Sequence, residues 1–175
     1  MKRPVLTYDD IKSTVPVQHG WQPTKTINFN ESLISLLGYY NKLSETCGGM
    51  PRLSAFNLRT LKSDIKNMIL VKSLGDLRPE RPYNYQIVGI GLRDLLEGEE
   101  SNNPEALATK KAIRQSIEKS LKVVEKKKKP YAFEGLIDEQ MKQTSFEFIV
   151  SQMQVLLLPF SSDCKNVNYI LAVVK

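Results

Sequence analysis

"VNYILAVVK" (Val167–Lys175) closes the sequence and is the stretch that decides its fold. Apolar residues follow one another from Ile170 to Val174 without polar residues between them. A strand with one face in water alternates apolar and polar residues, whereas a strand buried on both faces reads as a continuous apolar run. We therefore predict that the last strand of the chain lies in the middle of a sheet.

Two more strands are expected directly before it. "YAFEGLI" (131–137) alternates in character, and "SFEFIVSQMQVLLLPF" (145–160) begins with Phe146 and Phe148 on one face. The polar residues Ser151, Gln152 and Gln154 interrupt the second pattern and predict a bulge or a switch of face. The polar loop 161–166 joins this strand to the last one as a hairpin, so the chain is expected to end in three antiparallel strands.

The first half of the chain predicts a strand pair. "NMILVKSL" (67–74) and "YNYQIV" (83–88) flank a loop rich in Gly and Pro, which favours antiparallel pairing. Gly89 and Gly91 follow the second strand, but Asp94 stands where a dinucleotide-binding turn needs its third glycine. The two glycines are therefore expected to mark a close approach of backbone segments that leaves no space for a side chain.

Two main helices complete the pattern. The first follows a capping-box spacing of Asn28 with Glu31, although Asn30 competes as the cap, and it ends at Gly48. The second begins at Pro104 and connects the strand pair to the three later strands. We divide the chain into an N-terminal arm (1–27), a helical flank (28–64) and a core (65–175), and we expect one α+β domain.

This order of elements is that of the PAS sensory fold, and the sequence resembles a bacterial family of short single-domain PAS proteins. The matching segments are "LLGYYNKLSETCGGMPR", "NMILVKSL", "YNYQIVGIGL", "VLLLPFSSD" and "YILAVV". The resemblance implies a five-stranded antiparallel sheet in the order 2-1-5-4-3 with crossover helices. Gln86 stands where the family carries arginine, so the family's binding specificity does not transfer to this chain.

The apolar runs, cysteines and charges of the chain exclude some classes of protein and favour others. No apolar run approaches the roughly 20 residues of a membrane span, and the N-terminus does not read as a signal peptide. Cys47 and Cys164 lie far apart, which predicts a reduced, cytoplasmic protein, with Cys47 expected to be buried. The net charge is +6, and Lys126–Lys129 form a run that predicts either a solvated helix end or a footprint for nucleic acid or acidic surfaces.

Catalytic chemistry has little support in the sequence. The one histidine, His19, lies in the arm without a matching base or nucleophile, and no cofactor is predicted. We expect a sensory or regulatory PAS-like module without an output domain, acting through an unidentified small ligand, a signalling protein partner, or both. The alternatives are a binder of nucleic acid or acidic surfaces that uses Lys126–Lys129, with nucleic acid disfavoured, and a small α+β enzyme of unrecognised type.

Two sets of residues are candidates for that role. A ligand site between the sheet and the long helix is expected to be lined by apolar and aromatic side chains, namely Tyr85, Ile87, Ile117, Leu121, Phe146, Phe148 and Tyr169. A homodimer interface, which the resemblance suggests, would use the arm and the first helix through Val17, Trp21, Leu33, Leu36, Leu37 and Tyr40.

Overall fold

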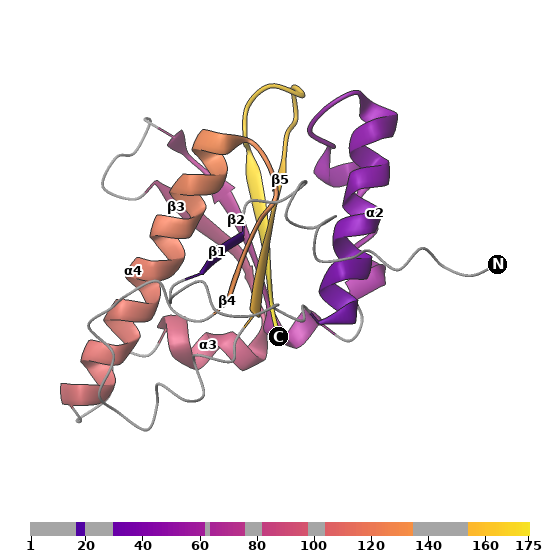
Figure 1. The fold of residues 1–175 in the computed structure, drawn as a ribbon. Coiled ribbons are helices and arrows are strands. Elements are labelled where there is room, and N and C mark those ends of the chain that lie inside the picture. The colour runs from indigo at the N-terminus through magenta and orange to yellow at the C-terminus, as the bar shows by residue number, and fades with distance from the viewer. Residues whose placement is uncertain (1–16, 20–29, 62–63, 76–81, 98–103, 135–153) are drawn as a thin grey trace.

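A computed structural model describes residues 17–19, 30–61, 64–75, 82–97, 104–134 and 154–175 (Figure 1). Six strands form one sheet, and these are β1 (Val17–His19), β2 (Met68–Ser73), β3 (Tyr83–Val88), β4 (Tyr131–Glu134), β5 (Gln154–Phe160) and β6 (Tyr169–Val174). The α-helices are α2 (Glu31–Cys47), α3 (Ile90–Glu97) and α4 (Pro104–Lys127). Short 3-10 turns η1 (Leu53–Ala55), η2 (Leu58–Leu61) and η3 (Ile65–Asn67) lie between α2 and β2.

The sheet has the order β1-β4-β5-β6-β2-β3. Its five antiparallel strands, numbered along the chain from β2, follow the order 2-1-5-4-3, so this prediction is confirmed. β6 lies between β5 and β2 and is buried on both faces from Ile170 to Val174. The continuous apolar run at the C-terminus therefore marks the centre of the sheet, as its pattern predicts.

The N-terminal arm contributes a strand that its sequence did not predict. β1 pairs in parallel with β4, with Val17 opposite Ala132 and His19 opposite Glu134. β4 would otherwise be the edge of the sheet, and an edge strand presents a row of backbone groups that can pair with another segment. A three-residue strand is too short to show a periodic pattern, which is why no pattern in the arm indicates it.

The pairing between β2 and β3 changes register partway along β3. Ile87 pairs with Leu70, but Tyr85 pairs with Val71, so Gln86 is an extra residue on the β3 side. Because side chains alternate along a strand, one extra residue moves every later side chain to the opposite face. Tyr85 and Ile87 consequently point to different faces of the sheet, although their spacing of two predicts a shared one.

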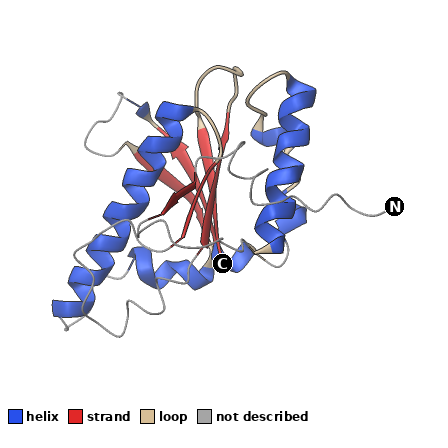
Figure 2. Ribbon diagram, viewed as in Figure 1, coloured by secondary structure: helices blue, strands red, loops and turns tan. Residues whose placement is uncertain are grey.

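Helices cover both faces of the sheet (Figure 2). On one face, here the α2 face, α2 packs with the 3-10 turns over β5, β6 and β2. On the other, the α4 face, α3 and α4 pass from β3 at one side of the sheet to β4 at the other. Alternating residues of the central strands supply both cores, since Leu171 and Val173 belong to the α2 face while Ile170 and Ala172 belong to the α4 face.

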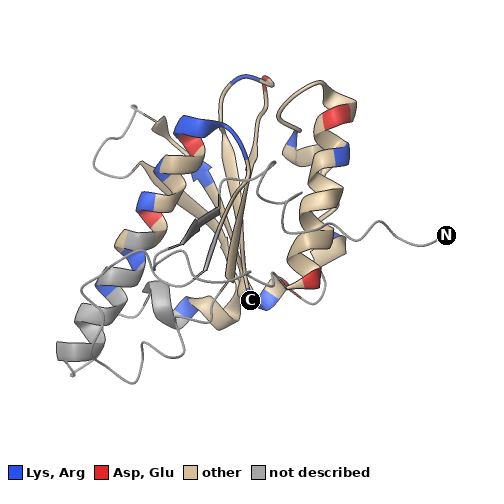
Figure 3. Cartoon of the chain, in the orientation of Figure 1, with Lys and Arg blue, Asp and Glu red and all other residues tan. Residues whose placement is uncertain are grey.

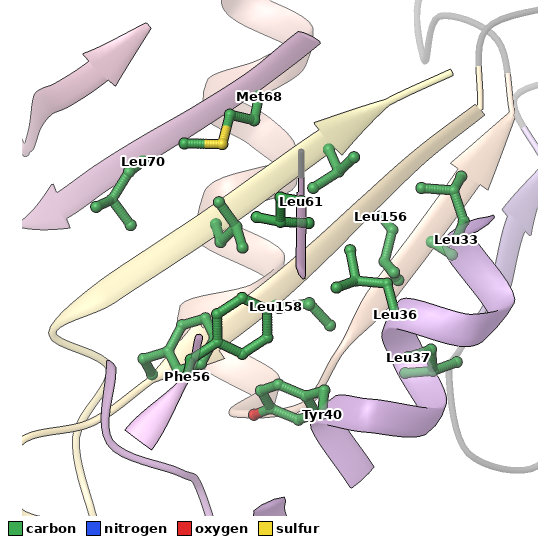
Figure 4. Close-up of a cluster of buried hydrophobic side chains, with 14 residues drawn as sticks. Leu33, Leu36, Leu37, Tyr40, Phe56, Leu61, Met68, Leu70, Leu156 and Leu158 are labelled. Carbon is green, nitrogen blue, oxygen red and sulfur yellow. The ribbon is translucent and has the colours of Figure 1, made fainter. Parts of the chain in front are cut away.

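The apolar stripe of α2 is part of the chain's own core, which corrects the expected dimer interface. Leu33, Leu36, Leu37 and Tyr40 are between 1% and 6% exposed and point toward the sheet (Figure 4). They pack against strand residues such as Leu156 and Leu158. The stripe therefore has an intramolecular partner and offers no surface to a second copy. Trp21 lies outside the described residues, and of Val17 the structure describes only the backbone.

The ends of α2 follow local capping rules. The side chain of Asn30, not Asn28, caps the helix, because its Oδ1 accepts a hydrogen bond from the Ser32 amide at 2.9 Å. Gly48 ends the helix with φ of 67°, a left-handed conformation in which glycine carries no steric penalty. Both ends bring α2 back onto the sheet within a few residues.

Gly89 and Gly91 lie where β3 passes into α3. A side chain on Gly89 would collide with the backbone carbonyls of Ile65 and Lys66, and one on Gly91 would collide with Asn67. The Gly89 amide also donates to the Met68 carbonyl at 2.8 Å. The glycines thus allow η3 and the start of α3 to pack backbone against backbone, as the sequence predicts, and they form no phosphate-binding turn.

Candidate functional site

Three of the predicted wall residues meet on the α4 face. Tyr85 from β3 and Ile117 from α4 are both partly buried, and Leu121 from the next turn of α4 is 0% exposed. They belong to one cluster with β6 and β2, so the strand and the long helix oppose each other there as expected. This is the region in which the candidate site is built.

The remaining predicted wall residues lie elsewhere. Ile87 is 39% exposed and sits on the α2 side, because of the bulge at Gln86. Tyr169 also packs on the α2 face, against the cluster that includes Leu171. Both predictions are therefore wrong in the face they assign. Phe146 and Phe148 lie outside the described residues.

A polar network that the sequence did not predict joins α4 to the β2–β3 pair. The hydroxyl of Tyr83 donates to Glu125 Oε2 at 2.7 Å, and the hydroxyl of Ser73 donates to Glu125 Oε1. Burial raises the pKa of the Tyr83 hydroxyl, and the neighbouring Glu125 carboxylate raises it further. Glu125 lies one helical turn after Leu121, so its place on the inward side of α4 was the available sequence signal.

The hydroxyl of Tyr85 is a further polar group on the α4 face. Among the described residues it has no hydrogen-bond partner. Burial raises the pKa of Tyr85, Glu118 on α4 raises it further, and Arg114 on the same helix opposes this shift. A partly buried phenol beside a cation and a carboxylate can donate to or accept from a bound molecule or water.

Tyr131, at the start of β4, lies at the far side of the same face. Its side chain is 1% exposed, and burial raises its pKa to about 12. The ammonium of Lys127 lies 5.7 Å from the centre of the ring, a cation–π distance. Ser120 on α4 is also fully buried. The α4 face thus combines apolar side chains with several hydroxyl groups, the two kinds of group that line small-molecule sites.

The other candidates from the sequence are distributed over the surface. Lys126–Lys129 are all exposed at the end of α4, followed by the buried Pro130. Cys47 and Cys164 are exposed free thiols, so the expected burial of Cys47 is wrong; the helix turns that position outward. The described residues contain no group of three or more His, Cys, Asp or Glu side chains placed to hold a metal ion.

None of the helices among the described residues is both long and apolar enough to cross a lipid bilayer. Comparisons of the chain with protein-family models, with curated proteins and with solved structures find no significant match.

Proposed function

We propose that the protein is a cytoplasmic PAS-like regulatory module without enzymatic activity, and that it responds to a small ligand bound between the sheet and α4. The observation that carries this proposal is Tyr85, whose hydroxyl faces α4 without a hydrogen-bond partner among the described residues. A buried polar group is normally paired, so a phenol left open in a cluster of apolar side chains favours a ligand or water as its partner.

The hydrogen bonds of Glu125 are the contacts through which ligand binding would affect other parts of the molecule. Glu125 lies on α4, whereas Ser73 and Tyr83 lie on the two strands that flank the loop at 76–81. A ligand that displaces α4 changes the distance between Glu125 and these two hydroxyls. The network is therefore the element through which binding would alter the surface, since a switch requires contacts that differ between two states.

The ligand expected from the lining is a largely apolar or aromatic molecule with one hydrogen-bonding group. Ile117 and Leu121 on α4, together with Val71 on β2, supply apolar contacts, and Tyr85 supplies the polar one. Glu118 and Arg114 on α4 both influence the Tyr85 hydroxyl, the carboxylate more than the guanidinium, so these two side chains do not select the charge of the ligand.

Native mass spectrometry of freshly purified protein tests the proposal. We expect a mass increment from a retained small molecule that disappears on denaturation, and we expect Tyr85→Phe to weaken its retention by about tenfold, the cost of one lost hydrogen bond of about 1–1.5 kcal/mol. Tyr40→Phe is the matched control, because it removes a phenol from the α2 face. Retention that is lost equally in both variants would contradict a site on the α4 face.

A further inference from the structure

One end of the sheet gathers cationic side chains from four separate segments. We call it the lysine end, and it consists of Arg52, Lys72, Lys126, Lys127, Lys128, Lys129 and Lys165, all exposed. Figure 3 shows the cationic stretches at the end of α4, along the connection to β4 and at the tip of the β5–β6 hairpin. Only the run at 126–129 is visible in the sequence, so the remaining cations join it through the fold.

Strand pairing and loop hydrogen bonds place these segments together. β4 starts at Tyr131, two residues after Lys129, and Tyr131 pairs antiparallel with Leu157 in the middle of β5, so the chain before Tyr131 lies toward the hairpin end of β5. The Ser161 amide donates to the Pro51 carbonyl at 3.0 Å, which brings Arg52 to the hairpin. The Ser73 amide donates to the Asn168 carbonyl at 2.9 Å, which brings Lys72 there as well.

The cations form a series of charged segments along one end of the sheet. Neighbouring strands lie about 4.8 Å apart, so β4 and β2, with β5 and β6 between them, are separated by about 15 Å. At physiological salt that separation is roughly two Debye lengths, so cations within one segment act jointly while those at the two sides are largely screened from each other. An extended anionic partner would therefore meet several cationic segments in turn.

The nearby carboxylates lower the positive potential but are outnumbered, because the seven cations of the lysine end face the charges of Glu125, Asp163 and Glu45. Glu125 accepts from Ser73 and Tyr83, while Asp163 accepts from the Ser161 hydroxyl and from two loop amides. Those backbone hydrogen bonds lower the pKa of Asp163. Glu45, at the end of α2, remains as an exposed carboxylate on this side. In the described part of the chain, none of the lysine-end cations forms an ion pair.

We propose that the lysine end docks an acidic polypeptide segment of a partner protein. All of its cations except Arg52 are lysines, which lack the forked two-point geometry that arginine offers to phosphate. No described aromatic side chain is exposed to stack a nucleic-acid base. The large apolar side chains that are exposed, Ile65, Ile87 and Ile90, lie at the opposite end of β2 and β3, so nothing described at the lysine end would insert into a lipid surface.

This surface shares no residue with the proposed ligand site, so the two proposals fail separately. The test measures fluorescence anisotropy with three probes: a labelled polyglutamate peptide of about 20 residues, a DNA duplex of about 20 base pairs, and vesicles of phosphatidylcholine with phosphatidylserine. The variant Lys126→Gln/Lys129→Gln/Lys165→Gln removes cations from two segments of the lysine end. The matched control Lys66→Gln/Lys111→Gln/Lys119→Gln removes the same charge elsewhere, from residues that are also exposed.

We expect the peptide to bind, with affinity that falls as salt rises, and we expect the lysine-end variant to weaken it about tenfold, roughly a factor of two for each lost contact. The control variant should weaken it less than twofold. Equal weakening in both variants would reduce the effect to net charge and overturn the proposal. Absence of peptide binding would also overturn the proposal. The same holds if DNA or vesicles bind more tightly than the peptide and the lysine-end variant weakens that binding.

NMR of the unaltered protein provides a measurement that does not depend on the variants. Addition of the polyglutamate peptide should shift the backbone amides of residues 126–129 and 163–166 and leave those of η3 and α3 in place. Shifts spread evenly over the exposed lysines of the whole molecule would contradict a docking surface at the lysine end.

Discussion

The two faces of the sheet are built from the same central strands but differ in chemistry. The α2 face is closed by aromatic rings in mutual contact, with Phe160 meeting Tyr40 at 5.5 Å and Phe56 at 5.1 Å between ring centres. Its one buried phenol, on Tyr40, donates to the Pro159 carbonyl at 2.7 Å. The edge-to-face rings and the paired Tyr40 hydroxyl match a structural core, although the partly buried Tyr169 on this face also has a hydroxyl without a described partner.

The α4 face has apolar walls but retains polar groups in its interior. Tyr83 and Glu125 form a hydrogen bond between helix and strand, and Tyr85 has no described partner. Six partly buried apolar or aromatic residues pack against each core among the described residues, and on this face they include Ile117 and Val123 on α4. One sheet can therefore have a closed core on one face and a candidate binding site on the other. This is possible because alternate side chains of each strand point to opposite faces and pack against different elements.

The largest expected difference comes from equal truncations on the two faces. Leu158 on the α2 face and Leu121 on the α4 face are both 0% exposed. We expect Leu158→Ala to cost about 4–5 kcal/mol and Leu121→Ala about 2–3 kcal/mol, since the cost depends on how tightly the surroundings hold the cavity. Urea denaturation at neutral pH measures both. Equal costs, or a larger cost for Leu121→Ala, would remove the distinction between the faces.

Removal of one hydroxyl should also destabilise the protein more on the α2 face than on the α4 face. Tyr40→Phe leaves the buried Pro159 carbonyl without its donor and should destabilise the protein by about 1–3 kcal/mol. Tyr85→Phe should change stability by less than about 0.5 kcal/mol, because no described residue loses a partner. Thermal or urea unfolding of the two variants decides between these outcomes. A large loss in Tyr85→Phe would show that its hydroxyl already has a structural role.

Alkaline pH should destabilise the protein through its buried tyrosines. Burial raises the pKa of Tyr131 from 10.0 to about 12, so the folded state keeps the neutral phenol while the unfolded state ionises first. The stabilisation is complete below about pH 10 and is lost as the pH rises toward about 12, by at most about 1.4 kcal/mol for each pH unit. Denaturation midpoints at pH 8, 10 and 11 measure the loss, and Tyr131→Phe should reduce it. A midpoint that is unchanged between pH 8 and 11 would contradict the burial of this phenol.

The smallest effect is expected at the lysine end. Replacement of Lys126–Lys129 by Gln should shift the melting temperature by no more than a few degrees, because exposed cations at a helix end contribute a few tenths of a kcal/mol each. Differential scanning fluorimetry is sufficient for this measurement. A large loss of stability would show that the lysine stems pack against the fold, and would assign a structural role to residues that the structure leaves exposed.

Much of the architecture was predictable from local patterns. The unbroken apolar run from Ile170 to Val174 identified the central strand, and Gly48 marked the end of α2. These features depend on a few neighbouring residues, so the sequence carries them directly. Gly89 and Gly91 were also interpreted correctly, because the residue at position 94 excluded the alternative.

The errors concern contacts between distant segments. The stripe on α2 showed an apolar face without showing whether the chain or a second copy would cover it. The bulge at Gln86 leaves no mark on the composition of β3, yet it sends Ile87 to the other face. Glu125 was overlooked because a glutamate near a lysine run is usually solvated, whereas here two hydroxyls on β2 and β3 reach it. Such pairings are set by the tertiary fold, which periodicity does not record.

The central claim, that the α4 face is the binding side of the sheet, is tested most directly by fluorine NMR of protein labelled with 3-fluorotyrosine. Tyr85→Phe and Tyr40→Phe assign the two signals. The labelled protein is then exposed to low-molecular-weight cell extracts and to a library of aromatic fragments. The account predicts that the Tyr85 signal shifts while the Tyr40 signal stays in place. A shift of Tyr40 alone, or no shift of Tyr85 with any extract or fragment, would contradict it.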